Sequence, residues 1–210
     1  MITPADDLPF ELAEVWLRWV SADETPLGGL STRYRERHRR YHTTAHLAHV
    51  LHDVEVLAAE ESVTDAGSIV AAAFYHDAVY EPRYPANERA SARLAKRDLA
   101  QIGWDEHRVG SVVTMIEATR DHLDPPNIDS SVLFDADLAI LGAGPTDYEA
   151  YSKAVRAEYR HLDDEEWTTG RARVLRSFLD RNAIYATRAG GTRWEQAARR
   201  NLQTELDSLS

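Results

Sequence analysis

Apolar residues recur every three or four positions along most of this chain, which is the spacing of one buried face of an α-helix. The pattern is clearest in residues 44–60, whose apolar stripe holds Leu47, Val50, Leu51, Val54, Leu57 and Ala58. Residues 69–75 are apolar on every side, which is typical of a fully buried helix. No segment shows the strict alternation of a half-buried strand. The pattern therefore predicts an all-α protein.

Nine segments carry the helical pattern, and proline or glycine separates several of them. The segments are residues 8–22, 44–60, 68–80, 87–103, 105–122, 130–144, 147–162, 168–185 and 192–209. Ser130 is the expected N-cap of the helix that starts there. No internal repeat or low-complexity linker divides the 210 residues. We therefore expect a single domain over residues 1–210, a bundle of about eight or nine helices.

Composition narrows the class of protein. The chain is 43% hydrophobic and 28% charged, which is ordinary for a globular domain with a real core. It has no cysteine, which excludes disulfides and thiolate metal sites and fits a reducing compartment. Its net charge of −11 argues against general nucleic-acid binding. Because the N-terminus also lacks the pattern of a signal peptide and no apolar run could span a membrane, we expect a cytoplasmic protein without membrane partners.

Three histidines fall within eight positions of the stretch RRYHTTAHLAHV, namely His42, His46 and His49. On a wheel of about 100° per residue, His46 lies at the border of the apolar stripe and His42 one turn earlier on the same flank. His49 points toward the wetter face. Such histidines are ordinarily solvent-exposed, but two of them four positions apart on one flank can act together if partners lie opposite.

Two further segments place carboxylates in apolar surroundings. The buried run ends directly in His76 and Asp77, and burying both groups is costly unless they are paired or bind a metal. Asp135 and Asp137 interrupt another apolar segment. Because two positions correspond to about 200°, these two cannot both face one site, and the pattern alone leaves open which of them does.

Taken together, these segments resemble the HD superfamily of metal-dependent phosphohydrolases, all-α proteins named for an adjacent His-Asp pair. The nearest resemblance is to small predicted bacterial HD phosphohydrolases and covers about residues 39–160. The shared motifs are R-x-YH-x-x-x-H at 39–46, HD-x-x-Y at 76–80, NE-x-x-SA at 87–92, T-x-x-H at 119–122 and D-x-DL-x-x-LG at 135–142. The first also looks like the Tyr-His-Asn-x-x-His signature of cyclic-nucleotide phosphodiesterases, with Thr43 in place of the asparagine.

The resemblance implies a metal site of one or two divalent ions. The implied ligands are His46, His76, Asp77 and Asp137, with Asp135 as the alternative to Asp137. Mixed imidazole and carboxylate ligands suit Mn, Mg, Fe, Ni, Co or Zn. By the same resemblance, His42 corresponds to the histidine that protonates the leaving oxygen, and Asp77 could also orient the attacking water.

Five further side chains are implied at the substrate: Arg39, Asn87, Glu88, His122 and Arg156. Arg39 has the guanidinium fork that suits phosphate oxygens. His122 is also a candidate ligand of a second metal. For Glu88 and His122 the ordinary alternative is a charged residue placed beside a helix dipole.

The expected function is hydrolysis of a small phosphomonoester or phosphodiester by a metal-activated water, with nucleotides among the candidate substrates. The alternative is a non-catalytic helical regulatory module that binds a metal or a nucleotide, with protein ligands in every metal position. A metal oxygenase would need additional histidine ligands, and His122 is the obvious spare. The tryptophan-bearing helices suit either a core or the interface of a homo-oligomer.

Overall fold

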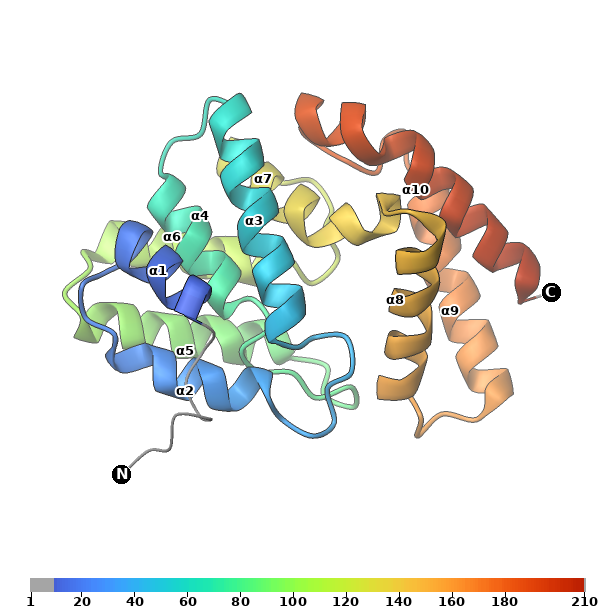
Figure 1. Cartoon of the computed structure of the whole chain (residues 1–210), viewed down its shortest axis with the longest axis horizontal. Coiled ribbons are helices and arrows are strands. Elements are labelled where there is room, and N and C mark those ends of the chain that lie inside the picture. Colours follow the sequence, from blue (N-terminus) through green and yellow to red (C-terminus); the bar gives the residue numbers. More distant parts are fainter. Residues whose placement is uncertain (1–9, 210) are drawn as a thin grey trace.

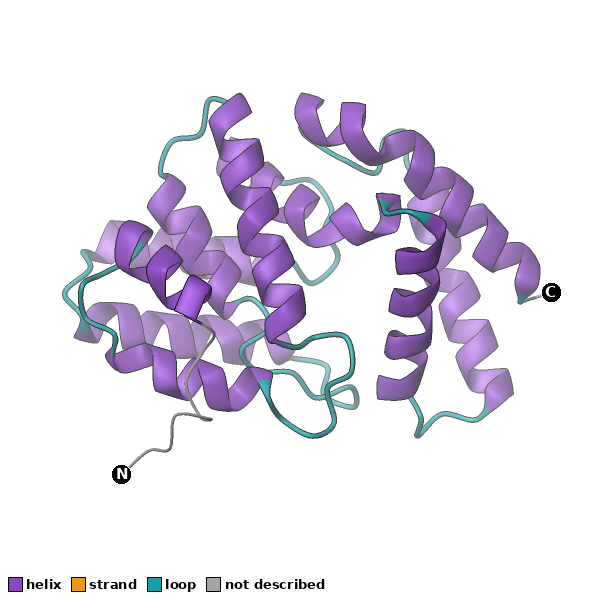
Figure 2. Cartoon of the chain, in the orientation of Figure 1, coloured by secondary structure: helices purple, strands orange, loops and turns teal. Residues whose placement is uncertain are grey.

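The computed structural model describes residues 10–209, and these residues form helices and loops without any strand (Figure 1, Figure 2). The elements are α1 (Phe10–Trp19), α2 (Thr25–Tyr34), α3 (Thr44–Glu60), α4 (Ala66–Tyr75), α5 (Asn87–Gln101), α6 (Glu106–Ala118), α7 (Ile128–Leu138), the 3-10 helix η1 (Ala139–Gly142), α8 (Pro145–Glu158), α9 (Asp164–Leu179) and α10 (Arg188–Ser208). The all-α prediction is confirmed. Residues 1–9 lie outside the described residues. They include the start of the first predicted segment and most of the N-terminal stretch that lacks a signal-peptide pattern.

One helix, α2, is not among the nine predicted segments, so the described residues hold ten α-helices rather than eight or nine. Gly28 and Gly29 lie in its middle, and each glycine disfavours a helix by about 1 kcal/mol relative to alanine. Pro26 lies in the first turn, where its missing N–H is not needed. Leu30 and Tyr34 are buried in the core. Tertiary packing therefore outweighs a weak local preference.

The apolar helix α4 belongs to the larger of two hydrophobic cores. Its residues from Gly67 to Tyr75 are all buried, and it packs against α1, α3, α5, α6 and α7. A smaller core joins η1, α8, α9 and α10, which lie together on the right of Figure 1. Trp194 of α10 packs against both cores.

The ends of two helices set the positions of the candidate site residues. Because α4 ends at Tyr75, His76 and Asp77 lie in the turn that follows it. The N-cap of α7 is Asn127, whose side chain accepts a hydrogen bond from the backbone N–H of Ser130. The predicted Ser130 cap is therefore wrong by one turn.

Within residues 10–209, no helix combines the length and the apolar character needed to cross a membrane.

Candidate metal centre

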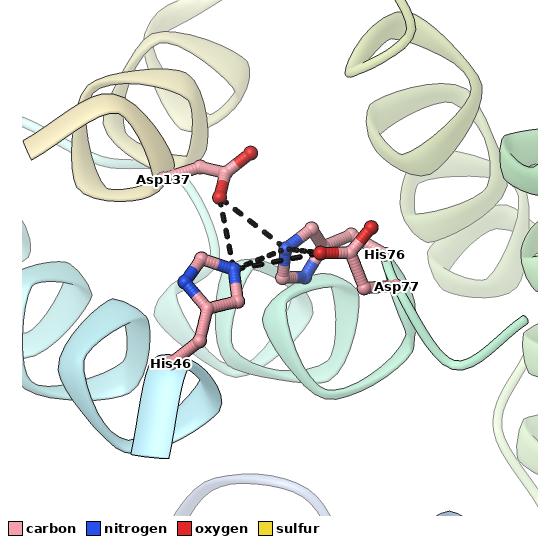
Figure 3. A group of neighbouring side chains, drawn as sticks. All are labelled: His46, His76, Asp77 and Asp137. Atoms are coloured by element: carbon pink, nitrogen blue, oxygen red, sulfur yellow. Dashed lines mark hydrogen bonds and ion pairs between the residues drawn. The ribbon is translucent and has the colours of Figure 1, made fainter. Parts of the chain in front are cut away.

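Two histidines and two aspartates from three distant segments meet where α3, α4 and α7 pack together (Figure 3). His46 projects from α3, His76 and Asp77 from the turn after α4, and Asp137 from α7. One ligand atom from each of the four lies within 4.8 Å of all the others. Both imidazoles are buried, whereas the side chains of Asp77 and Asp137 are 20% and 15% exposed. The structure thus brings together the four residues for which the sequence predicts metal binding.

The four groups direct their donor atoms toward a common point. Nε2 of His46 lies 3.2 Å from Oδ1 of Asp137 and 3.4 Å from Oδ2 of Asp77. Nε2 of His76 lies 3.1 Å from the same oxygen of Asp77 and 3.4 Å from the same oxygen of Asp137. The two Nε2 atoms are 3.4 Å apart. Each carboxylate therefore faces both imidazoles.

His76 is held in the tautomer that a metal ligand needs. Its Nδ1 lies 2.8 Å from the backbone carbonyl oxygen of Ala73. Since a carbonyl oxygen can only accept, Nδ1 carries the proton, and the lone pair of the neutral ring is on Nε2, inside the cluster. Two imidazole nitrogens and two carboxylate oxygens at one point fit a divalent cation that takes mixed nitrogen and oxygen ligands.

The charges of the cluster are coupled. Burial disfavours the charged form of all four groups, yet the neighbouring carboxylates raise the pKa of His46 and of His76. The imidazoles in turn hold the pKa of Asp77 and of Asp137 well below its usual range, against the same effect of burial. In their protonated forms the two histidines would balance the two carboxylates, and a divalent cation beside neutral histidines would give the same balance. A metal would therefore compete with protons for this cluster.

Asp135 points away from the cluster. Its Oδ1 accepts the backbone N–H of Ala186 at 2.8 Å, and its Oδ2 accepts the N–H and the hydroxyl of Thr187 at 2.8 and 2.6 Å. The carboxylate thus holds the loop before α10. As the angle of about 200° between them requires, only one of the two aspartates faces the cluster, and it is Asp137.

His122 contacts the cluster from a loop rather than from a helix end. Helix α6 ends at Ala118, and His122 follows with a positive φ of 50°. The expectation of a helix-terminal histidine is therefore wrong. Its Nε2 lies 2.9 Å from Oδ2 of Asp137, whereas the other oxygen, Oδ1, faces His46 and His76. His122 thus orients a candidate ligand instead of joining the four-residue group.

A cleft of about 520 Å³ opens onto the cluster, a size typical of small-molecule sites. His42, His76, Asp77 and Asp137 all line it. Its aromatic lining consists of Tyr41, Tyr80, Tyr84, Tyr151, Tyr159 and Phe178. Residues of the smaller core, among them Leu138, Leu141 and Tyr151, line one part of the cleft, and the segments that carry His42, His76 and His122 line the rest.

Asn87 and Glu88, two of the predicted substrate residues, also line the cleft. The amide of Asn87 is already occupied, because it donates to the carbonyl of Glu81 at 3.0 Å and accepts the N–H of the same residue at 3.1 Å. Asn87 therefore shapes the loop between α4 and α5. The carboxylate of Glu88 has no such contact among the described residues.

The predicted phosphate contact of Arg39 is wrong. Its side chain is fully buried and does not line the cleft. The guanidinium donates to the backbone carbonyls of His42, Asp77 and Ala78 at 3.1, 2.8 and 3.2 Å, and it also pairs with Glu36. Arg39 thus ties the segment carrying His42 to the turn carrying Asp77, and its donors are not available to a substrate.

The guanidinium of Arg156, the other arginine predicted to contact the substrate, is also occupied by protein partners. Its guanidinium donates to the carbonyls of Tyr159 and Leu162 and pairs with Asp164 at 2.9 Å. It lies over the ring of Trp167, at 5.3 Å from the ring centroid, and does not line the cleft. Its role is to close the end of α8 against the start of α9.

Glu158, two positions after Arg156, is the main residue that the sequence did not reveal. Its side chain is fully buried, and its Oε2 lies 2.7 Å from Nδ1 of His42. Burial alone would raise the pKa of Glu158, but the bonds from His42 and from the backbone N–H groups of Arg40 and Tyr41 outweigh it and lower the pKa to about 2. On an amphipathic helix this glutamate looks like any exposed acid, so no local signal marks it.

Glu158→Gln is expected to make folding less sensitive to acid. The folded pKa of about 2 lies below the ordinary 4.5. The charge therefore stabilises the fold above pH 4.5, and this contribution is lost as the pH falls through 4.5 toward 2. The lowered pKa corresponds to a contribution of at most about 3 kcal/mol to the free energy of unfolding. Urea unfolding of metal-free wild type and variant should show a smaller difference in unfolding free energy near pH 3 than at neutral pH. An equal difference at both pH values would contradict the assigned contacts.

No protein-family model, curated protein or solved structure matches this chain.

Proposed function

We propose that this chain is a metal-dependent phosphohydrolase of the HD type that cleaves a small phosphomonoester or phosphodiester. The observation that carries the proposal is the cluster of His46, His76, Asp77 and Asp137, which is reached through a cleft. A catalytic metal site needs such an open side, whereas a structural site is closed by protein ligands. This accessibility favours the enzyme over a non-catalytic binding module.

The residues around the cluster suit distinct roles in hydrolysis. A divalent ion held there would supply Lewis acidity, which lowers the pKa of water and offsets charge on phosphoryl oxygens. Asp77 is placed to orient the attacking water, because its carboxylate belongs to the cluster and also lines the cleft. His42, 20% exposed in the same cleft with Nε2 at 3.9 Å from Oδ2 of Asp77, is placed to give a proton to the leaving oxygen.

Two other arginines replace Arg39 and Arg156 as candidates for binding the phosphate. Arg83 and Arg120 both line the cleft, and both are exposed. Among the described residues, neither guanidinium has a hydrogen-bond or ion-pair partner, so both can contact an anion. Tyr84 lines the same cleft with 48% of its surface exposed, which suits stacking on a planar ring such as a nucleotide base.

Replacing both arginines, in Arg83→Ala with Arg120→Ala, is expected to raise KM about 10-fold or more while kcat changes little. Each lost charge-assisted bond weakens ground-state and transition-state binding alike. Steady-state kinetics on the best substrate would measure this. Arg93→Ala is the matched control, because Arg93 is exposed on α5 and does not line the cleft. Equal changes in KM for the control and the double variant would argue against the two arginines.

The test of the proposed function is a phosphate-release screen. Metal-free protein is loaded separately with Mn, Mg, Co, Ni, Fe or Zn and offered nucleotides, cyclic nucleotides, sugar phosphates and aryl phosphates. We expect release with at least one metal and none in the presence of a chelator. Saturable binding of a metal and a nucleotide, without turnover of any substrate, would favour the regulatory module instead.

A further inference from the structure

The carboxylate of Glu158 is held at both oxygens. Its Oε1 accepts the backbone N–H groups of Arg40, Tyr41 and His42 at 2.6, 2.8 and 3.1 Å. Its Oε2 accepts from Nδ1 of His42 at 2.7 Å and from the hydroxyl of Tyr80 at 2.9 Å. Five donors around one buried carboxylate leave it no freedom to rotate.

We propose that Glu158 is a positioning residue that determines which ring nitrogen of His42 faces the metal centre. The inference rests on the proposed function, in which His42 exchanges a proton with the substrate. A carboxylate can only accept, so the proton facing Glu158 belongs to Nδ1. Nε2 is then the nitrogen directed toward Asp77, at 3.9 Å from its Oδ2. In the doubly protonated ring, Nε2 carries the proton that passes to the leaving oxygen, and Nδ1 keeps its own. Histidine catalysis depends on this choice, because the two ring nitrogens are not interchangeable.

Glu158 also explains how the smaller core takes part in the site. It is the last residue of α8, which packs with η1, α9 and α10, whereas His42 precedes α3 of the larger core. The contact spans 116 residues of sequence. Three of its bonds fix the backbone of residues 40–42 and a fourth fixes the imidazole, so α8 sets both the position and the tautomer of His42.

Glu158→Gln separates the effect of Glu158 on the position of His42 from its effect on the tautomer of His42. The amide oxygen can still accept the three backbone N–H groups, which keeps the segment in place. The amide N–H₂ then faces His42, and because it donates, Nδ1 must accept and the proton moves to Nε2. Asp129→Asn is the matched control. Asp129 is also a buried carboxylate that accepts two backbone N–H groups, those of Thr64 and Asp65, but it does not line the cleft.

The first measurement is ¹⁵N NMR of the His42 ring in metal-free protein, at a pH where the ring is neutral. His42→Ala identifies the signals. We expect the proton on Nδ1 in the wild type and in Asp129→Asn, and on Nε2 in Glu158→Gln. A wild-type ring protonated on Nε2 would overturn the proposal, and this result needs no variant to fold.

The second measurement is a double-mutant cycle on activity. Glu158→Gln should lower kcat roughly 10–100-fold with KM nearly unchanged, and it should change kcat less than about 2-fold in a His42→Ala background. An undiminished effect in that background would show that Glu158 acts elsewhere and would overturn the proposal. Absence of activity in the wild type would count against the proposed phosphohydrolase, whereas the NMR result would still decide whether Glu158 positions His42.

Discussion

Asp77→Ala is expected to abolish metal-dependent phosphate release, by about 10³-fold or more, while the helical fold persists. Oδ2 of Asp77 lies within 3.4 Å of both imidazoles of the cluster, so its loss removes a candidate ligand and the group placed to orient water. The fold should survive because Asp77 lies in a turn. Its contribution to the Arg39 network is a backbone carbonyl, which alanine keeps.

Phosphate release at saturating metal, together with far-ultraviolet circular dichroism, measures both parts of this expectation. Asp207→Ala is the control, since it removes an exposed carboxylate near the end of α10. Full activity in Asp77→Ala would remove Asp77 from the mechanism. Loss of helical content would leave the activity result without meaning, and Asp77→Asn, which keeps the shape of the side chain, would then replace it.

His42→Ala is expected to lower kcat by about 10²–10⁴-fold without weakening metal binding. His42 lies beside the four-residue cluster but is not part of it. If it protonates the leaving oxygen, the loss should depend on the leaving group. An alkyl phosphate, whose alkoxide leaves poorly, should lose far more than an aryl phosphate with an acidic phenol, which needs little protonation.

Paired rate measurements on an alkyl and an aryl phosphate therefore test the role of His42 directly. His52→Ala is the control, because His52 is exposed on α3, the helix that follows His42. An equal loss on both substrates would contradict general acid catalysis by His42. Such a result would indicate instead that the imidazole contributes to binding or to local structure.

Helices were predicted correctly from the sequence wherever the apolar periodicity of a segment and its tertiary packing favour the same structure. The apolar stripe of residues 44–60 and the fully apolar run of residues 69–75 both predicted the helices that the structure contains. Helix α2 did not follow, because Gly28 and Gly29 weaken its local signal and its stability comes from contacts distant in sequence. Periodicity reports what a segment buries, not what lies opposite.

The residues of the candidate site were likewise predictable only in part. Resemblance singled out Asp137, and helical geometry required that Asp135 face elsewhere, but only the tertiary structure shows Asp135 bound to the loop before α10. Arginine was the least predictable residue type. A guanidinium that suits phosphate also suits backbone carbonyls, and Arg39 is occupied by three of them. Glu158 was unpredictable because its partners lie 78 to 118 residues away in the sequence.

The most direct test of the metal centre is calorimetric titration with Mn²⁺ or Zn²⁺ of two metal-free proteins, the wild type and His76→Ala. We expect saturable binding with release of protons, because the cation displaces them from His46 and His76, whose pKa values are raised. We also expect an affinity at least about 100-fold weaker in the variant. No saturable binding to the wild type, or equal binding to both proteins, would contradict a metal centre at these residues.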